Sequence, residues 1–243
     1  MKRLFLMITV GLALFVTSGN VFGQEDNGDG DEKLSLSLDL ASGFIWRGLP
    51  NNLSPVVQPA ITFKPGRFSI GTWASTPISP WGGDQEIDIF AEFEISSALK
   101  LGITDYYVYG SNSDPSYFNF DKDKTCHALD FMLMYESAGG FKAMLSTIFA
   151  GADLNNDGKN NFSTYIEIGY GRTFKKMDWS LCLGFVPMES GFYDLEDANF
   201  VNIGLGVSKS FEITPTYSLP LSLNFTINPA AKAAFLVATV SLF

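Results

Sequence analysis

Polar and apolar residues alternate one by one along most of this chain. The clearest stretch is "LSLSLDL", where the four leucines of residues 34–40 alternate with two serines and Asp39. Successive side chains of an extended strand point to opposite faces, so this period of two predicts strands with one apolar and one polar face. The chain is therefore expected to be all-β.

Similar runs recur to the last residue and predict about twelve strands. Most have roughly the 9–11 residues that a tilted transmembrane strand needs, whereas strands of soluble proteins average about five or six. The predicted strands are 33–47, 54–64, 67–75, 85–94, 98–109, 126–136, 140–150, 162–172, 177–187, 200–209, 217–227 and 234–243.

The connections between these strands differ in length in a regular way. From the second to the ninth, short turns such as "KPG" and "SAGG" alternate with long polar loops such as "AGADLNNDGKNN". Outer-membrane barrels have short periplasmic turns and longer outer loops. We therefore expect residues 33–243 to form a transmembrane antiparallel up-and-down β-barrel of about twelve strands, with both ends periplasmic.

Aromatic residues fall at the ends of the apolar faces, as in the girdles of membrane barrels. Phe243, the last residue, would join the periplasmic girdle and is similar to the terminal signal by which outer-membrane barrels are recognised for assembly. The periplasmic girdle is predicted to contain Phe63, Phe68, Phe93, Tyr135, Phe141, Tyr170 and Trp179, and the outer one Trp46, Phe149 and Phe185.

The first 23 residues have the pattern of a secretory signal peptide. Lys2 and Arg3 precede an apolar run from Leu4 to Val16, which is too short to span a bilayer. The acidic segment 24–32, "QEDNGDGDE", cannot bury apolar surface and is expected to be a disordered stub. The predicted location is the bacterial outer membrane.

The charge balance limits the partners. The chain has 16 basic and 26 acidic residues, a net charge of −10, which argues against nucleic acid as a partner. The expected partners are the lipid bilayer with its outer-membrane lipids, the barrel assembly machinery and small solutes.

The polar faces of the strands are expected to line the inside of the barrel. Their excess of carboxylates predicts an acidic, cation-preferring channel; the alternative is a network of ion pairs that fills the lumen. The predicted pore-lining residues are Asp39, Arg47, Gln58, Asp88, Glu92, Lys100, Asp130, Lys142, Glu167 and Asn202.

Two motifs could indicate calcium binding or hydrolase activity. In "DLNNDG", Asp153, Asn155 and Asp157 have the spacing that begins a calcium loop, but Thr164 stands where the full motif has a bidentate Glu. Turn chemistry explains the same residues, so calcium is a weak candidate and no other cofactor is expected. His127 is the only histidine and has no nucleophile pattern beside it. A rim hydrolase is therefore the least favoured function, and we expect no enzyme.

One block of sequence resembles a known family. The stretch "LDLASGFIWRGLPNNLSPVVQPAITF", followed by "FSIGTWAS", is similar to the TorF-like outer-membrane porins of Gram-negative bacteria, and weaker similarity continues through "LGITDYYVYG" and "STYIEIGYG". The matching residues are Phe44, Trp46, Arg47, Gly48, Ser54, Pro55, Gln58, Pro59, Gly71, Trp73 and Ser75. The resemblance implies a barrel with a channel role and brings no catalytic residues.

The resemblance also directs attention to Arg47. At the outer end of the first predicted strand it would point inward near the mouth, pair with Asp88 or Glu86, and set the pore width or serve as a structural ion pair. The sequence thus predicts a narrow passive channel for small solutes; the alternative is a structural or surface-binding barrel with a plugged lumen.

Overall fold

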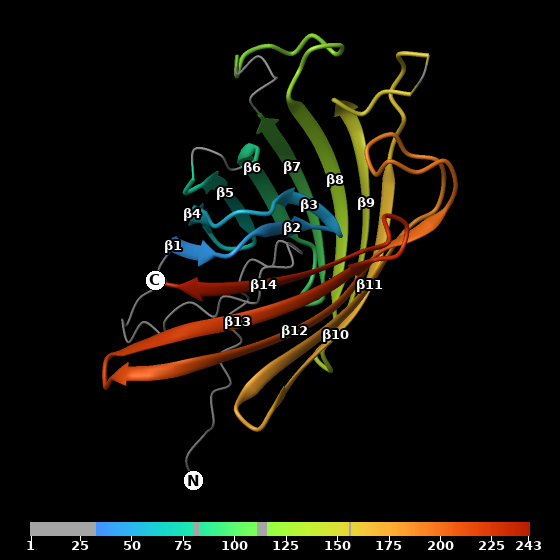
Figure 1. Ribbon diagram of the computed structural model, residues 1–243. Helices are drawn as coiled ribbons and strands as arrows, with labels where there is room; N and C mark the ends of the chain where they lie inside the picture. Colours follow the sequence, from blue (N-terminus) through green and yellow to red (C-terminus); the bar gives the residue numbers. More distant parts are fainter. Residues whose placement is uncertain (1–32, 80–82, 111–115, 156) are drawn as a thin grey trace.

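Twelve strands of this chain form one closed antiparallel barrel (Figure 1). The computed structural model describes residues 33–79, 83–110, 116–155 and 157–243, so the predicted signal peptide (1–23) and stub (24–32) lie outside the described residues. The wall consists of β1 (Leu34–Ala41), β4 (Val56–Phe63), β5 (Phe68–Pro77), β6 (Gln85–Glu94), β7 (Leu99–Tyr109), β8 (His127–Glu136), β9 (Phe141–Gly151), β10 (Thr164–Phe174), β11 (Met177–Val186), β12 (Asn199–Thr214), β13 (Tyr217–Asn228) and β14 (Ala233–Ser241). The predicted all-β, up-and-down architecture is confirmed.

Neighbours in sequence are neighbours in the sheet, and β1 closes the barrel by pairing with both β14 and β4. We call the end of the barrel that carries the tight β4–β5, β6–β7, β8–β9, β10–β11 and β12–β13 turns the turn end. We call the opposite end the loop end, because it carries the long connections that follow β5, β7, β9 and β11. Residue Leu34 of β1 and residue Ser241 of β14 both lie at the turn end.

Strand β6 shows how the sequence alternation becomes two faces. Glu86, Asp88 and Glu92 point inward and are at most 4% exposed, whereas Ile87 and Ile89 point outward and are 37% and 46% exposed. A slip of one residue would exchange the two faces, so this pattern fixes the register of the wall. The barrel is apolar outside and largely polar inside.

Aromatic side chains gather on the outer surface at the turn end, where the sequence places them. The group consists of Phe63, Phe68, Phe93, Tyr135, Phe141, Tyr170 and Trp179, with exposures from 38% to 48%, and Phe243, which is 54% exposed. Trp46 was expected at the opposite rim, and this prediction is wrong: its side chain is 4% exposed and lies inside the barrel.

The predicted first strand, 33–47, is also wrong at its far end. β1 stops at Ala41, and the chain then forms a separate two-stranded hairpin of β2 (Phe44–Trp46) and β3 (Leu49–Asn52). All three residues of β2 are buried, which does not occur in a wall strand with one face outside. Arg47 (φ 49°) and Gly48 (φ 85°) make the tight connection, and positive φ at both positions is what a type I′ hairpin turn requires.

Candidate functional site

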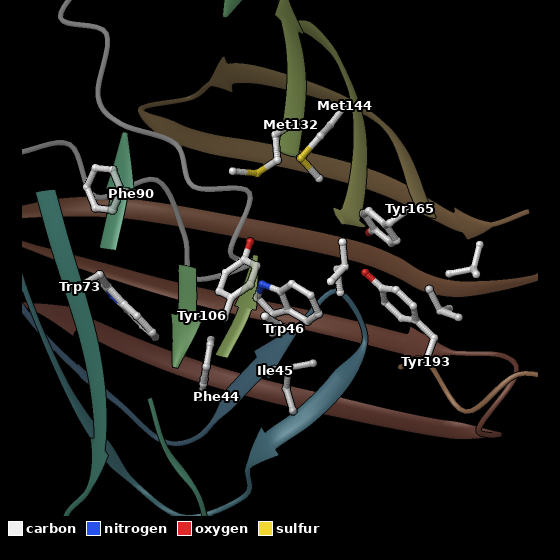
Figure 2. Close-up of a cluster of buried hydrophobic side chains, with 14 of the residues drawn as sticks. Phe44, Ile45, Trp46, Trp73, Phe90, Tyr106, Met132, Met144, Tyr165 and Tyr193 are labelled. Atoms are coloured by element: carbon white, nitrogen blue, oxygen red, sulfur yellow. The ribbon is translucent and has the colours of Figure 1, made fainter. Parts of the chain in front are cut away.

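The β2–β3 hairpin lies inside the barrel. Figure 2 shows Phe44, Ile45 and Trp46 among inward side chains from several wall strands. The Phe44 ring lies 5.1 Å from that of Trp73 on β5, and the Trp46 ring lies 5.2 Å from that of Tyr106 on β7. These residues of the hairpin therefore pack against the β5–β7 side of the wall.

Arg47, at the hairpin tip, is the centre of the lumen network. Its Nη2 donates to Oδ2 of Asp130 on β8 (3.0 Å), and its Nη1 donates to Oγ of Ser146 on β9 (2.7 Å). The two charged side chains are only 2% and 0% exposed. A buried charge whose partner is removed costs about 3–5 kcal/mol, so this pair ties the hairpin tip to the opposite wall.

Further contacts complete the surroundings of Arg47. Ser146 Oγ also lies within hydrogen-bonding distance of both carboxylate oxygens of Asp130, at 2.7 and 2.6 Å. The guanidinium carbon lies 4.4 Å from the ring centre of Trp46 and 4.9 Å from that of Tyr165 on β10. Such cation–π contacts strengthen when water is excluded. Arg47 is thus enclosed by aromatic rings as well as bonded to a carboxylate.

Tyr193, from the loop between β11 and β12, closes the site from the loop end. Its hydroxyl accepts a hydrogen bond from Nη1 of Arg47 (3.2 Å), and its ring stacks near that of Trp46 with centroids 6.0 Å apart. Burial raises the pKa of the Tyr193 hydroxyl to about 12, although the nearby guanidinium opposes that shift. A loop residue therefore shares the site with the hairpin.

Gly48 allows the hairpin tip to meet the backbone of β12. A Cβ atom at this position would collide with the carbonyl oxygen of Val201. The Gly48 carbonyl accepts a hydrogen bond from Nδ2 of Asn228 on β13 (3.1 Å). Only glycine combines this close approach with positive φ.

The base of the hairpin is held differently, by amide side chains. Asn51 Nδ2 donates to Oε2 of Glu86 on β6 (2.9 Å), and Asn52 Nδ2 donates to the carbonyl of Asp84 (3.0 Å). Glu86 and Asp88 are 3% and 1% exposed, and no ion pair joins either of them to a cation in the described part of the chain. The predicted pairing of Arg47 with these carboxylates is wrong, because the hairpin carries Arg47 across the lumen to Asp130.

A second buried network lies on β10 and β12 beside the tip. The Tyr165 hydroxyl donates to Oε2 of Glu167, and Nδ2 of Asn202 donates to the same carboxylate oxygen (3.0 Å). All three residues are at most 1% exposed. This network holds the wall beneath Arg47 in one arrangement.

The structure places the predicted pore-lining residues at different levels of the lumen. Asp130, Glu167 and Asn202 lie around the hairpin tip, while Glu92 and Lys100 form an ion pair (3.5 Å) nearer the turn end. Lys142 is bound instead to Glu136 (3.1 Å) near the turn between β8 and β9. Asp39 and Gln58 are buried and lie opposite each other on β1 and β4.

Sequence reasoning missed three members of the Arg47 site: Ser146, Tyr165 and Tyr193. The strand alternation places Ser146 and Tyr165 on inward faces, but nothing in the pattern singles them out. Tyr193 lies in a loop, where no alternation of polar and apolar residues predicts which way a side chain points. Their roles depend on where the hairpin tip arrives.

His127 lies outside the lumen, on the outward row of β8, as the sequence indicates. Its Nδ1 is 2.9 Å from both carboxylate oxygens of Asp105, and its Nε2 is 2.6 Å from the carbonyl oxygen of Tyr117. The rings of Tyr107, Tyr117 and Phe120 lie within 4.9 Å of its ring centre, which leaves His127 1% exposed. One ring nitrogen thus bonds the neighbouring wall strand β7, and the other attaches the β7–β8 loop to the outer wall.

The weak calcium candidate lies in the long loop between β9 and β10. Asp153 is 2% exposed, and its two carboxylate oxygens accept hydrogen bonds from the backbone N–H and hydroxyl of Ser163 (2.8 and 2.7 Å). Asn155 Oδ1 accepts from the backbone N–H groups of Asp157 and Lys159. Among the described residues no group of three or more His, Cys, Asp or Glu side chains has a metal-binding arrangement. These oxygens fit the turn chemistry of a loop better than a cation cage.

No protein-family model matches this chain, and no curated protein matches it. The resemblance to the TorF-like porins therefore stays a prediction from the sequence blocks. In the part of the chain that the structure describes, none of the elements is a helix long and apolar enough to cross a membrane.

Proposed function

We propose that this protein is an outer-membrane barrel that passes small solutes when its internal hairpin moves, and that the arrangement described above is its closed state. The outer surface supports the membrane location. Large apolar side chains are exposed on it around the wall, among them Leu36 (57%), Leu205 (43%) and Leu236 (66%). An exposed apolar belt of this extent is far larger than the patches of soluble monomers and is what lipid contact requires.

The observation that carries the closed state is the burial of Arg47. The inward polar side chains of a water-filled channel are in contact with water, whereas Arg47, Asp130 and Glu167 are at most 2% exposed. The hairpin tip occupies the space beside them. Solute passage at this level therefore requires the tip to leave the β8–β10 wall.

Other lumen atoms favour a channel over a permanently dry core. Oδ1 of Asp39, Oε1 of Gln58, Oδ1 of Asp88 and Oγ1 of Thr239 are buried without a hydrogen-bond partner in the protein. Buried polar groups are nearly always satisfied by protein or water, so this side of the lumen is adapted to hydration. With the hairpin displaced, the carboxylates would outnumber the cations and favour cation passage.

Planar-bilayer recordings of the mature chain, starting at residue 24, test this proposal. The wild type is expected to show rare, brief openings, and Arg47→Gln to raise the open probability roughly ten-fold or more, because the tip loses its buried ion pair. Arg67→Gln, at an exposed arginine of the turn end, is the matched control and is expected to behave as wild type. A steady large conductance of the wild type would contradict the closed state.

A second candidate is a structural or surface-binding barrel with a permanently filled lumen. The aromatic packing of Trp46 against Tyr106, Phe192 and Tyr193 favours it, because such contacts resemble a protein core. If wild type and Arg47→Gln both insert into bilayers and neither conducts, this second function replaces the channel. We propose no catalytic role for either form.

A further inference from the structure

Charge is distributed unevenly between the two ends of the barrel. Acidic residues are numerous in the long loops of the loop end: Asp84, Asp121, Asp123, Asp153, Asp157, Glu189, Asp194, Glu196 and Asp197. Most basic residues after the signal region lie at or near the turn end: Lys33, Lys64, Arg67, Lys100, Lys142, Arg172, Lys175, Lys176 and Lys209. Glu94, Glu136, Asp178 and Glu212 also lie at the turn end, so the rim at this end is basic on balance, with more cations than carboxylates.

Part of that rim is neutralised by ion pairs. Lys64 binds Glu94 (2.6 Å), and the pairs of Lys100 and Lys142 with carboxylates were described above. On the β10–β11 hairpin, by contrast, no ion pair joins Arg172, Lys175 or Lys176 to a carboxylate of the described chain. Three exposed cations are left there for an external anion.

These cations border an apolar groove on the outer face of the same hairpin. The groove has a volume of about 260 Å³ and is lined by Tyr170, Arg172, Phe174, Trp179 and Leu181. Cross-strand pairing sets Arg172 opposite Trp179 and Tyr170 opposite Leu181. Apart from Arg172, the groove is lined by aromatic and aliphatic side chains.

Two lysines form the turn beside the groove. Their backbone has positive φ, which residues other than Gly, Asn and Asp rarely adopt. Lys175 and Lys176 have φ values of 52° and 59°, and hairpin turns of this kind usually carry Asn and Gly. Lys175 Nζ lies 5.2 Å from the ring centre of Phe174. The two ammonium groups therefore stand next to the groove at the tip of the hairpin.

We propose that the outer face of the β10–β11 hairpin binds an anionic phospholipid, with its phosphate at Arg172 and the two turn lysines and its acyl chain along Tyr170, Trp179 and Leu181. This inference rests on the proposed insertion in the outer membrane, which places the turn end against the phospholipid leaflet. Charge complementarity selects an anionic headgroup, because no carboxylate of the described residues forms an ion pair with the exposed arginine and the two lysines. The apolar lining selects a lipid rather than a soluble phosphate.

Native mass spectrometry of the full mature chain tests the site. The protein is released from nanodiscs containing equal amounts of palmitoyl-oleoyl phosphatidylglycerol and palmitoyl-oleoyl phosphatidylcholine, which have the same acyl chains and carry an anionic and a zwitterionic headgroup, respectively. We expect the retained lipid to be enriched in phosphatidylglycerol roughly ten-fold at low salt, and less at high salt. Equal retention of the two lipids would overturn the proposal.

Two triple variants locate the binding. Arg172→Gln with Lys175→Gln and Lys176→Gln is expected to abolish the enrichment. Lys122→Gln with Lys124→Gln and Lys159→Gln, three lysines of the loop end, is the matched control and is expected to keep it. Enrichment that survives in the first variant, or is lost in both, contradicts the site. Adding glycerol phosphate during release tests for a soluble anion, and displacement of phosphatidylglycerol by an equimolar amount of it would show that the acyl-chain contacts add nothing and would also contradict a lipid site.

Insertion into nanodiscs, lipid preference and conductance are separate measurements, so the lipid site and the proposed channel can fail independently. A chain that inserts into nanodiscs but shows no lipid preference contradicts only the lipid site. A chain that does not insert at all contradicts the membrane function, and a chain with lipid preference but no conductance in any variant contradicts only the channel.

Discussion

The tip and the base of the β2–β3 hairpin are anchored by different chemistry. The tip is held by a buried ion pair, Arg47 with Asp130, and by the close fit of Gly48 against β12. The base is held by neutral amides, Asn51 and Asn52, next to carboxylates that have no cation partner in the described chain. If the tip moves as proposed, loss of one charge would release it while the amide contacts keep the base attached, and the base would then act as the hinge.

The largest expected effect is on the ion pair of the tip. Asp130→Asn leaves the Arg47 guanidinium buried without its counter-charge, and we expect a loss of about 3 kcal/mol or more in stability. Thermal unfolding followed by the gel-mobility shift of the refolded barrel measures it. The double variant Arg47→Gln with Asp130→Asn is expected to be more stable than Asp130→Asn alone. Equal stabilities would contradict a buried pair at the tip.

Gly48 tests the fit of the tip without changing any charge. Gly48→Ala adds a Cβ that collides with Val201 and favours negative φ, so we expect it to dislodge the tip and raise the open probability as Arg47→Gln does. Gly66→Ala is the matched control, because Gly66 also has positive φ (75°) but has no atom within 4 Å of its added Cβ. That control is expected to lose about 1 kcal/mol of stability and keep the wild-type conductance.

A smaller effect is expected at the base of the hairpin. Asp88→Asn removes a buried carboxylate that has no cation partner, so we expect stability to stay within about 1 kcal/mol of wild type or to rise. The same unfolding measurement checks it beside Asp130→Asn. If the two Asn variants lost equal stability, the contrast between tip and base would be wrong.

The smallest effect concerns Tyr193 and includes a change in stability at high pH. Since burial raises the pKa of this hydroxyl to about 12, its contribution to stability is present below pH ~10 and is lost as pH rises towards 12. Tyr193→Phe is expected to remove that part of the pH dependence and to cost about 1 kcal/mol at neutral pH. Phenolate absorbance during a pH titration of both proteins measures it, and a difference between the two curves centred at about pH 10, the ordinary pKa value of a tyrosine, would contradict the burial of Tyr193.

The barrel wall was predictable from the sequence because period-two alternation is a local signal. The alternation of "EIDIFAEFE" predicts which residues of β6 face inward, and the tight turns predict antiparallel neighbours without a crossover. The end of the first strand was not predictable from the same signal. "GFIW" continues the apolar composition of β1, yet the structure buries three consecutive residues there, in a hairpin that the wall does not include.

Period-two alternation and loop lengths were enough to predict the strands and their two faces, because both depend on residues close together in the chain. The partners of Arg47 depend on the closed barrel instead, because Asp130, Ser146 and Tyr193 are 83, 99 and 146 residues away. Those contacts exist because closing the barrel creates a lumen into which the hairpin folds. The buried guanidinium of Arg47 requires a carboxylate in the part of the wall that the hairpin tip contacts. No local sequence pattern specifies which part that is.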